Sequence, residues 1–131
     1  AIQTRNDVRT LLQQGRDRAD AGQFSEAATL WQRAASEYRQ SGDRLNEARS
    51  LNYLSFAYLQ LGQYQQALFT IQQCKALLQQ ASNQAGTSLI LAQALNTEGS
   101  IQLAMGQTQA ALDTWQNAEK IYDSALSLIH I

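Results

Sequence analysis

The sequence predicts an all-α fold, an α-solenoid of three helix-turn-helix repeats with six antiparallel helices. Three observations support this prediction. The 131 residues include no proline, which would interrupt helices, and 44% of them are apolar, enough to fill a compact core. Apolar residues recur at helical spacing along most of the chain. One pattern of small and apolar residues also occurs three times.

Internal repetition is the decisive feature. Gly15 and Gly22 stand seven residues apart, and the same step starts again at Ser55 and at Gly99. The matching positions are Gly15, Gly22, Phe24, Ala27, Trp31 and Ala34; Ser55, Gly62, Tyr64, Ala67, Ile71 and Cys74; and Gly99, Gly106, Thr108, Ala111, Trp115 and Ala118. Small residues at the close-packing positions predict three hairpins stacked in a row, and an unstacked bundle of three hairpins is the alternative.

The helices follow from the spacing between turn residues. The six expected helices span 4–21, 25–41, 44–61, 65–85, 88–105 and 109–126. Turns are expected at 22–24, 42, 62–63, 86 and 106–107, because glycine adopts the left-handed conformation that ends many helices. Apolar residues of the second helices, such as Trp31, Ile71 and Trp115, should pack beneath the first helix of the same or the following repeat.

The stretch from Ala48 to Cys74 reads ARSLNYLSFAYLQLGQYQQALFTIQQC, with Leu-Asn-x-Leu in its first half and LGQYQQAL at its turn. It resembles one tetratricopeptide repeat of the long-period type that kinesin light chains contain. The resemblance implies a right-handed superhelix and a single domain over residues 1–131, with repeats at about 4–42, 43–86 and 87–126.

The repeat length adds a finer expectation. Glycines of the three hairpin turns lie 40 and then 44 residues apart, whereas the common tetratricopeptide unit has about 34 residues. We therefore expect longer helices. The pairs Gly42-Asp43 and Gly86-Thr87 should each end one helix with glycine and cap the next with a side-chain oxygen. The four extra residues of the second repeat would then lie inside its second helix, adding about one turn of 3.6 residues.

Charge and composition narrow the classes of partner. Ten basic and eleven acidic residues nearly cancel, so no overall field attracts nucleic acid or an anionic membrane. No apolar run approaches the roughly 20 residues of a membrane span. Lys75 is the only charge between Arg49 and Glu98, in a region rich in Gln, Asn and Ser. We expect a protein or peptide partner. The single cysteine excludes an internal disulfide and slightly favours a cytoplasmic location, whereas the sequence determines neither the compartment nor the oligomeric state.

In tetratricopeptide arrays the first helices line a concave groove, and the resemblance places peptide-binding residues at fixed offsets from each repeat's start. With starts at Val8, Ala48 and Ala92, these residues are Arg9, Arg16, Arg49, Asn52, Tyr53, Phe56, Gln93, Asn96 and Ser100. Asn52 and Asn96 are equivalent, and an Asn amide can pair with the backbone of an extended peptide. Leu12 stands at that offset in the first repeat, so this asparagine ladder has two rungs.

Each group also has a simpler interpretation. Asn52 and Asn96 fit a solvated polar face equally well. For Arg9, Arg16 and Arg49 the alternative to binding acidic side chains is local pairing with Asp17, Asp20 or Glu47, which we favour. Tyr53 and Phe56 fit either a pocket for an apolar side chain or packing between repeats.

Catalytic chemistry is sparse. A thiolate nucleophile needs a base within reach, and only Cys74 and His130 are candidates. Cys74 stands where the other copies have Ala34 and Ala118, which predicts a small buried residue. One cysteine and one histidine give no metal-ligand spacing, and no glycine-rich phosphate loop occurs. We expect no cofactor and no enzymatic activity.

The last six residues, 126–131, read LSLIHI and resemble a translated sequencing adapter. They predict a non-native tail on a truncated reading frame, and the alternative is an apolar helix end that closes the last repeat.

Functions from different classes fit these observations. The first is a protein-interaction module that binds a partner segment in its groove. The second is the N-terminal sensor array of a larger enzyme, because GQFSEAATLWQRAASEYRQSGDRLNEARSLNYLS resembles arrays that precede CHAT-type cysteine protease domains in cyanobacterial-type proteins. A third is a bacterial peptide-pheromone receptor, for which three repeats form a shallow groove.

Overall fold

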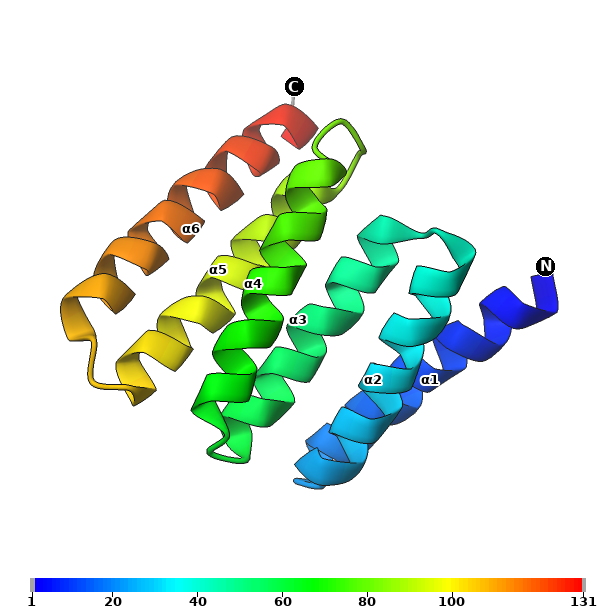
Figure 1. The fold of residues 1–131 in the computed structure, drawn as a ribbon. Helices are drawn as coiled ribbons and strands as arrows, with labels where there is room; N and C mark the ends of the chain where they lie inside the picture. The colour runs from blue at the N-terminus through cyan, green and yellow to red at the C-terminus, as the bar shows by residue number, and fades with distance from the viewer. Residues whose placement is uncertain (1, 131) are drawn as a thin grey trace.

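The computed structural model describes the backbone of residues 2–130 and the side chains of residues 7–127. This part of the chain is all α-helical and folds into three hairpins that lie side by side (Figure 1). The helices are α1 (Ile2–Asp20), α2 (Phe24–Ser41), α3 (Arg44–Gln60), α4 (Tyr64–Gln80), α5 (Thr87–Ala104) and α6 (Thr108–His130). The predicted all-α solenoid of three helix-turn-helix repeats is confirmed.

The boundary between the first two hairpins forms as predicted. Gly42 ends α2 with a positive φ of 77°, and its N–H bonds the Arg39 carbonyl. Asp43 then caps α3, because its Oδ1 accepts a hydrogen bond from the Asn46 backbone N–H at 3.2 Å. Glycine ends one helix and a carboxylate starts the next, so the connection is only two residues long.

The connection between the second and third hairpins differs from the prediction. Helix α4 ends at Gln80 rather than at 85, and residues 81–86 form a loop. Thr87 donates its hydroxyl to the Ala81 carbonyl at 2.7 Å instead of capping an amide, and Gly86 precedes α5 with a φ of 88°. The extra residues therefore lengthen the loop and not the helix. At the other end, the backbone of α6 continues past the predicted boundary at Leu126, and the side chains of 128–131 lie outside the described residues.

Each hairpin is held together where its two helices approach most closely. A Cβ on Gly15 would lie 2.3 Å from the Trp31 indole nitrogen, and a Cβ on Gly99 would lie 2.3 Å from that of Trp115. The space that glycine leaves lets each indole donate a hydrogen bond across the hairpin, from Trp31 to the Leu12 carbonyl and from Trp115 to the Asn96 carbonyl.

The middle hairpin uses another pair at the same positions. Ser55 replaces glycine, and its hydroxyl donates to the Ala67 carbonyl at 2.7 Å, while Ile71 replaces tryptophan and is fully buried. The three hairpins therefore share the same positions of closest approach but fill them with two different residue pairs, Gly with Trp in the outer two and Ser with Ile in the middle one.

Packing between hairpins uses the second helix of one and the first helix of the next. The Trp31 and Tyr53 rings lie 5.3 Å apart between α2 and α3, which confirms that Trp31 packs under the first helices of its own and the following repeat. One apolar cluster runs from Trp31 through Leu54 and Ile71 to Ile101 and reaches all three hairpins, and a smaller cluster lies within the first hairpin.

The interface between α4 and α5 contains a buried polar group. Glu98 is 6% exposed, and its carboxylate accepts hydrogen bonds from Lys75 Nζ at 3.0 Å and from Gln72 Nε2 at 2.7 Å. The equivalent residue in α3 is Leu54, which is also buried. A buried carboxylate with two donors is tolerated here, but it depends on both of them.

We expect Gly15→Ser to lower the free energy of unfolding by about 1–3 kcal/mol, because the new side chain overpacks against Trp31. Adding Trp31→Ile recreates the pair of the middle hairpin, so the double variant should be more stable than the sum of the two single effects predicts, by at least about 1 kcal/mol. Urea unfolding of the four proteins measures this coupling. Strict additivity would contradict the close-approach role of Gly15.

We expect Lys75→Met to lower the free energy of unfolding by about 2 kcal/mol, since it leaves the Glu98 carboxylate buried with one donor. The double variant Lys75→Met/Glu98→Leu should recover to within about 1 kcal/mol of the parent, because leucine already occupies this position in α3. Chemical denaturation tests both. A double variant no more stable than Lys75→Met would show that the cost lies in lost packing of Lys75.

Candidate functional site

The predicted groove residues lie around two adjoining hollows between the first helices of the hairpins. The arginine hollow, between α1 and α3, has a volume of 450 Å³ and is lined by Arg9, Leu12, Gln13, Arg16, Tyr38, Asn46, Arg49 and Tyr53. The amide hollow has a volume of 360 Å³ and is lined by Arg16, Ala19, Asp20, Trp31, Asn52, Tyr53, Phe56, Gln93, Asn96 and Thr97. Arg16 and Tyr53 line both, so the hollows form one groove across α1, α3 and α5.

Asn52 is the central polar group of the amide hollow. It is only 6% exposed, and its Oδ1 accepts a hydrogen bond from Thr97 Oγ1 at 2.8 Å. Within residues 7–127 every fully buried side-chain nitrogen or oxygen has a hydrogen-bond partner. The Asn52 Nδ2 makes no hydrogen bond with these residues, so this atom is not fully buried. Its N–H donors are therefore accessible from the hollow. Thr97 fixes the amide so that it presents donors to the groove.

Asn96 lines the same hollow but is held differently. Its side chain is exposed, while its backbone carbonyl accepts hydrogen bonds from Trp115 Nε1 at 3.1 Å and from the Ser100 hydroxyl at 3.2 Å. The structure thus brings Asn52 and Asn96 together around one hollow with unequal exposure. Ser100 lines neither hollow, so it is the one predicted groove residue that the structure leaves outside.

The arginine hollow has three guanidinium groups on its walls and no carboxylate among its lining residues. Within residues 7–127 the ion pairs are Arg18–Glu26, Arg33–Glu37 and Lys75–Glu98. None includes Arg9, Arg16 or Arg49, so the local pairing that we favoured is wrong for these side chains. Arg49 instead donates to the Asn46 side-chain oxygen at 3.1 Å.

Tyr38 also lines the arginine hollow, and two of its arginines affect the pKa of the Tyr38 phenol. Burial raises the pKa of the Tyr38 phenol, Asp43 raises it further, and Arg49 and Arg9 act in the opposite direction. The Tyr38 phenol therefore stays neutral near neutral pH, and Arg49 and Arg9 are close enough to act on it as positive charges.

Tyr53 and Phe56 pack between repeats, which was one of their two predicted roles. Tyr53 packs on Trp31, and Phe56 meets Phe24 edge-on with ring centroids 6.0 Å apart. Both also line the amide hollow, and Phe56 remains 39% exposed. Packing between repeats thus holds both rings in place at the wall of the amide hollow.

Sequence reasoning missed Thr97, Trp31 and Tyr38 as lining residues. Trp31 and Tyr38 belong to second helices but reach the groove between two first helices. Thr97 follows Asn96 directly, and a search for the partner of a buried Asn52 amide in the next first helix would have found it.

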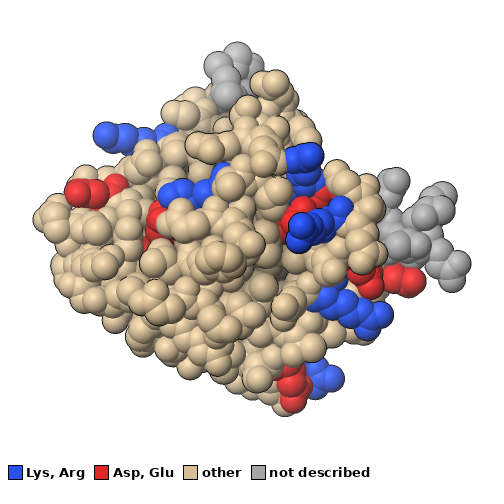
Figure 2. All heavy atoms as spheres, viewed as in Figure 1, with Lys and Arg blue, Asp and Glu red and all other residues tan. Residues whose placement is uncertain are grey.

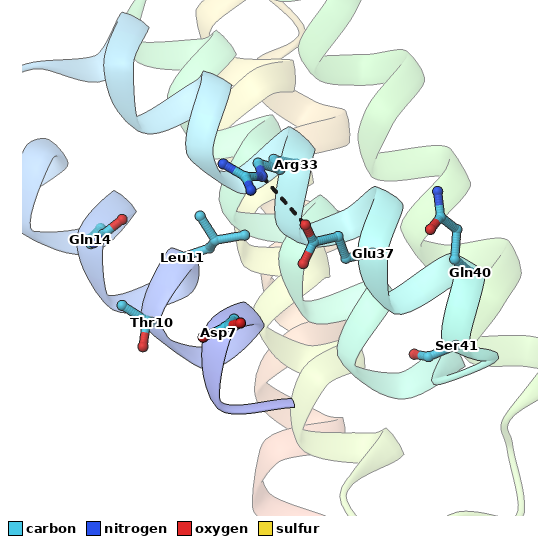
Figure 3. Close-up of a pocket in the computed structure, with 8 residues that line it drawn as sticks. All are labelled: Asp7, Thr10, Leu11, Gln14, Arg33, Glu37, Gln40 and Ser41. Carbon is cyan, nitrogen blue, oxygen red and sulfur yellow. Dashed lines mark hydrogen bonds and ion pairs between the residues drawn. The ribbon is translucent and has the colours of Figure 1, made fainter. Parts of the chain in front are cut away.

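A further hollow of 570 Å³ lies on the outer side of the first hairpin (Figure 3). Its polar lining includes Asp7, Thr10 and Gln14 of α1, across from the Arg33–Glu37 ion pair of α2. It lies at the end of the row and not on the wall formed by the first helices. Many charged side chains lie over this half of the molecule. A broad uncharged area covers the middle of the face shown in Figure 2.

The structure gives Cys74 a packing role. Its side chain is fully buried, and Sγ lies 3.1 Å from the Ala48 carbonyl oxygen, to which the thiol donates. Burial raises the pKa of the Cys74 thiol to about 12, with Lys75 slightly opposing the shift. A thiol of this kind is a poor nucleophile near neutral pH. The side chain of His130, its candidate base, lies outside the described residues.

Residues 7–127 contain no group of three or more His, Cys, Asp and Glu side chains placed to hold a metal ion. None of the helices described is long and apolar enough to cross a bilayer.

Comparison with known families identifies the repeat. A tetratricopeptide repeat model matches residues 7–80, which is more than half of the chain. The chain belongs to the tetratricopeptide repeat family. Among solved structures it is similar to the TPR domain of Arabidopsis FLU, with a TM-score of 0.71 and 16% sequence identity over 97% of this chain and 98% of that one. At this identity the likeness shows the fold alone. No curated protein matches the sequence.

The raised pKa of Cys74 predicts how stability depends on pH. Below pH 9, the ordinary pKa of a free thiol, Cys74 is protonated in both the folded and the unfolded states. Between pH 9 and about 12 only the unfolded chain loses the proton, so stability should fall by up to about 1.4 kcal/mol per pH unit.

Cys74→Ala, which matches Ala34 and Ala118, provides the control because it removes this titration alone. Urea unfolding of both proteins from pH 8 to 11 measures the difference. Parallel pH profiles would contradict the assigned burial of the thiol.

Proposed function

We propose that this tetratricopeptide repeat domain binds an extended segment of a partner protein in the groove across α1, α3 and α5. Tetratricopeptide repeat domains generally mediate protein–protein interactions. The observation that carries the proposal is the Asn52 amide, which is fixed by Thr97 with its donors open to the amide hollow. A fixed amide beside the exposed Asn96 can pair with a peptide backbone without reading side chains.

This arrangement is similar to the asparagine ladder of kinesin light chains, the long-period type that the sequence resembles. Leu12 replaces asparagine at the matching offset of the first repeat and lines the arginine hollow instead. Backbone recognition by asparagine is therefore confined to the middle and last hairpins, and the first hairpin contributes charge.

The residues that line the groove favour ligands with acidic and apolar side chains. Arg9, Arg16 and Arg49 surround a hollow without a carboxylate, so an acidic side chain of the ligand would provide the missing counter-charge. The partly exposed ring of Phe56 offers a contact for an apolar side chain. A segment that combines acidic and apolar residues fits both hollows. The contact area of three repeats is small, so affinity for a single peptide should be modest.

The alternative, a regulatory array attached to a CHAT-type cysteine protease, rests on sequence resemblance. It predicts a cysteine protease domain encoded after Leu126 of the parent gene, and a stop codon there would exclude it. A peptide-pheromone receptor of the long-repeat type would bind through the same groove, and further repeats in the parent gene would favour it.

The test uses a displayed library of random peptides selected against the full chain. Selected peptides should carry acidic residues next to aromatic or aliphatic ones. Their affinity, measured by fluorescence polarisation, should fall about tenfold or more in Asn52→Ala/Asn96→Ala. Arg16→Glu should weaken the binding of acidic peptides more than that of neutral ones, because Arg16 lines both hollows.

Arg33→Ala on the outer side of α2 is the matched control and should not change affinity, since Arg33 pairs with Glu37 at the surface and lines neither hollow of the groove. Circular dichroism checks that the groove variants fold. Loss of the Asn52 oxygen leaves Thr97 Oγ1 a second acceptor, the Gln93 carbonyl at 3.2 Å. Peptides that bind the groove variants as tightly as the parent would exclude this groove as the binding site.

A further inference from the structure

The charged side chains of the first hairpin and the start of α3 lie in separate places. Up to Arg49, the structure describes the side chains of seven arginines and seven acidic residues. Four of the arginines have an acidic neighbour outside the groove: Arg18 has Glu26, Arg33 has Glu37, and Arg39 and Arg44 have Glu47. The other three, Arg9, Arg16 and Arg49, all line the arginine hollow, so positive charge gathers there.

The acidic residues of α1 line other hollows. Asp7 lines the outer hollow of the first hairpin (Figure 3), and Asp20 lines the amide hollow. Asp17 lines another hollow beside α1, of 380 Å³, and accepts a hydrogen bond from Gln13 Nε2 at 3.0 Å. The arginine hollow thus has three guanidinium groups among its lining residues and no carboxylate to neutralise them.

Asn46 holds Arg49 in place without neutralising it. The Asn46 Oδ1 accepts a hydrogen bond from Arg49 Nη1 at 3.1 Å, and its Nδ2 donates to Asp43 Oδ2 at 2.8 Å. Asp43 Oδ1 accepts from the Asn46 backbone N–H, so both oxygens of this carboxylate are bonded within the helix cap. Burial and then Asp43 raise the pKa of the Tyr38 phenol, and Arg49 and Arg9 oppose this, so guanidinium groups of α3 and α1 lie near one phenol.

We propose that the arginine hollow binds a phosphorylated side chain of the partner segment, an inference that rests on the proposed function of the groove. A phosphate monoester carries a charge of about −1.5 to −2 at pH 7 and three strong acceptor oxygens. Each guanidinium group presents a planar fork of N–H donors that matches such oxygens. A carboxylate has one charge and two oxygens, so it would leave most of the positive charge of this hollow without a partner.

The position of the hollow favours a peptide as the source of the phosphate. Arg16 and Tyr53 line both hollows, so the chain that follows a bound phosphate can enter the amide hollow, where Asn52 presents its N–H donors. The next cation along the chain, Lys75, pairs with Glu98, so the positive surface ends at the arginine hollow. A nucleic acid strand or an anionic membrane is bound through a longer basic surface.

The test compares fluorescein-labelled peptide pools that share one fixed central residue between random flanks. The central residue is phosphoserine, phosphotyrosine, serine, tyrosine or glutamate, and fluorescence polarisation measures binding to the full chain. At least one phosphorylated pool should bind about tenfold or more tightly than its unmodified counterpart, and several-fold more tightly than the glutamate pool. Inorganic phosphate and single-stranded oligothymidylate serve as competitors and should displace the phosphorylated pool only at higher concentration than the unlabelled phosphopeptides do.

Two variants with the same loss of charge test the location of the site. Arg9→Gln/Arg49→Gln removes arginines of the hollow and should reduce the preference for the phosphorylated pool to less than about twofold. Arg33→Gln/Arg39→Gln is the matched control and should keep the preference, because both of its arginines belong to α2 and line neither hollow of the groove. Circular dichroism and urea midpoints check that both variants fold.

Asn52→Ala/Asn96→Ala separates this inference from the proposed function. It should weaken the binding of all pools and leave the ratio between phosphorylated and unmodified pools unchanged. Pools that depend on the two asparagines but bind equally with and without phosphate would overturn phosphate recognition and leave the peptide groove standing. Phosphate-dependent binding that Asn52→Ala/Asn96→Ala leaves unchanged would support the arginine site and count against the peptide groove.

Three further results would overturn the proposal. The first is a preference for phosphate that Arg9→Gln/Arg49→Gln leaves intact. The second is an equal loss in Arg33→Gln/Arg39→Gln, which would assign the effect to overall charge. The third is displacement by inorganic phosphate or oligothymidylate at lower concentration than by phosphopeptides, which would assign the hollow to a free anion or to nucleic acid.

Discussion

The close approach of two helices within each hairpin is the constraint on which the rest of the structure depends. Gly15 and Gly99 leave room for an indole, and the indole hydrogen bonds end on the carbonyls of Leu12 and Asn96. These two residues match Asn52, the rung position of the groove. The bond inside the hairpin thus fixes the rotation of the first helix, and this rotation determines which side chains face the hollows. In the first and last hairpins one contact therefore sets both the core packing and the side chains that line the hollows, and in the middle hairpin the bond from Ser55 to the Ala67 carbonyl stands in its place.

Most of the fold could be predicted from the sequence, because small residues and turn glycines recur at fixed positions. The end of α4 could not. Residues 81–85 contain neither glycine nor proline, so local propensity allowed a continuous helix up to Gly86. The bond from the Thr87 hydroxyl to the Ala81 carbonyl closes the loop instead. This bond depends on the docking of α5 against α4, which a reading of local preferences does not include.

The candidate site was predictable to a similar degree. Register placed the asparagines and arginines on one wall, and all predicted groove residues except Ser100 line a hollow. The partners of these side chains were not predictable. Asn52 bonds Thr97, 45 residues away, and Asp17 accepts from Gln13 instead of pairing with an arginine. Contacts between repeats depend on how the hairpins stack. The spacing of charged residues within one helix does not predict this stacking.

The distribution of tryptophan has a practical consequence. The molecule has two indoles, one bonded within the first hairpin and one within the last, while the middle hairpin has Ile71 in their place. Emission from Trp31 and Trp115 therefore reports on the two ends of the row, and the middle hairpin has no tryptophan emission of its own. Single-tryptophan versions would show whether the ends melt together or one after the other, a question that arises for any array in which each unit contacts only its neighbours.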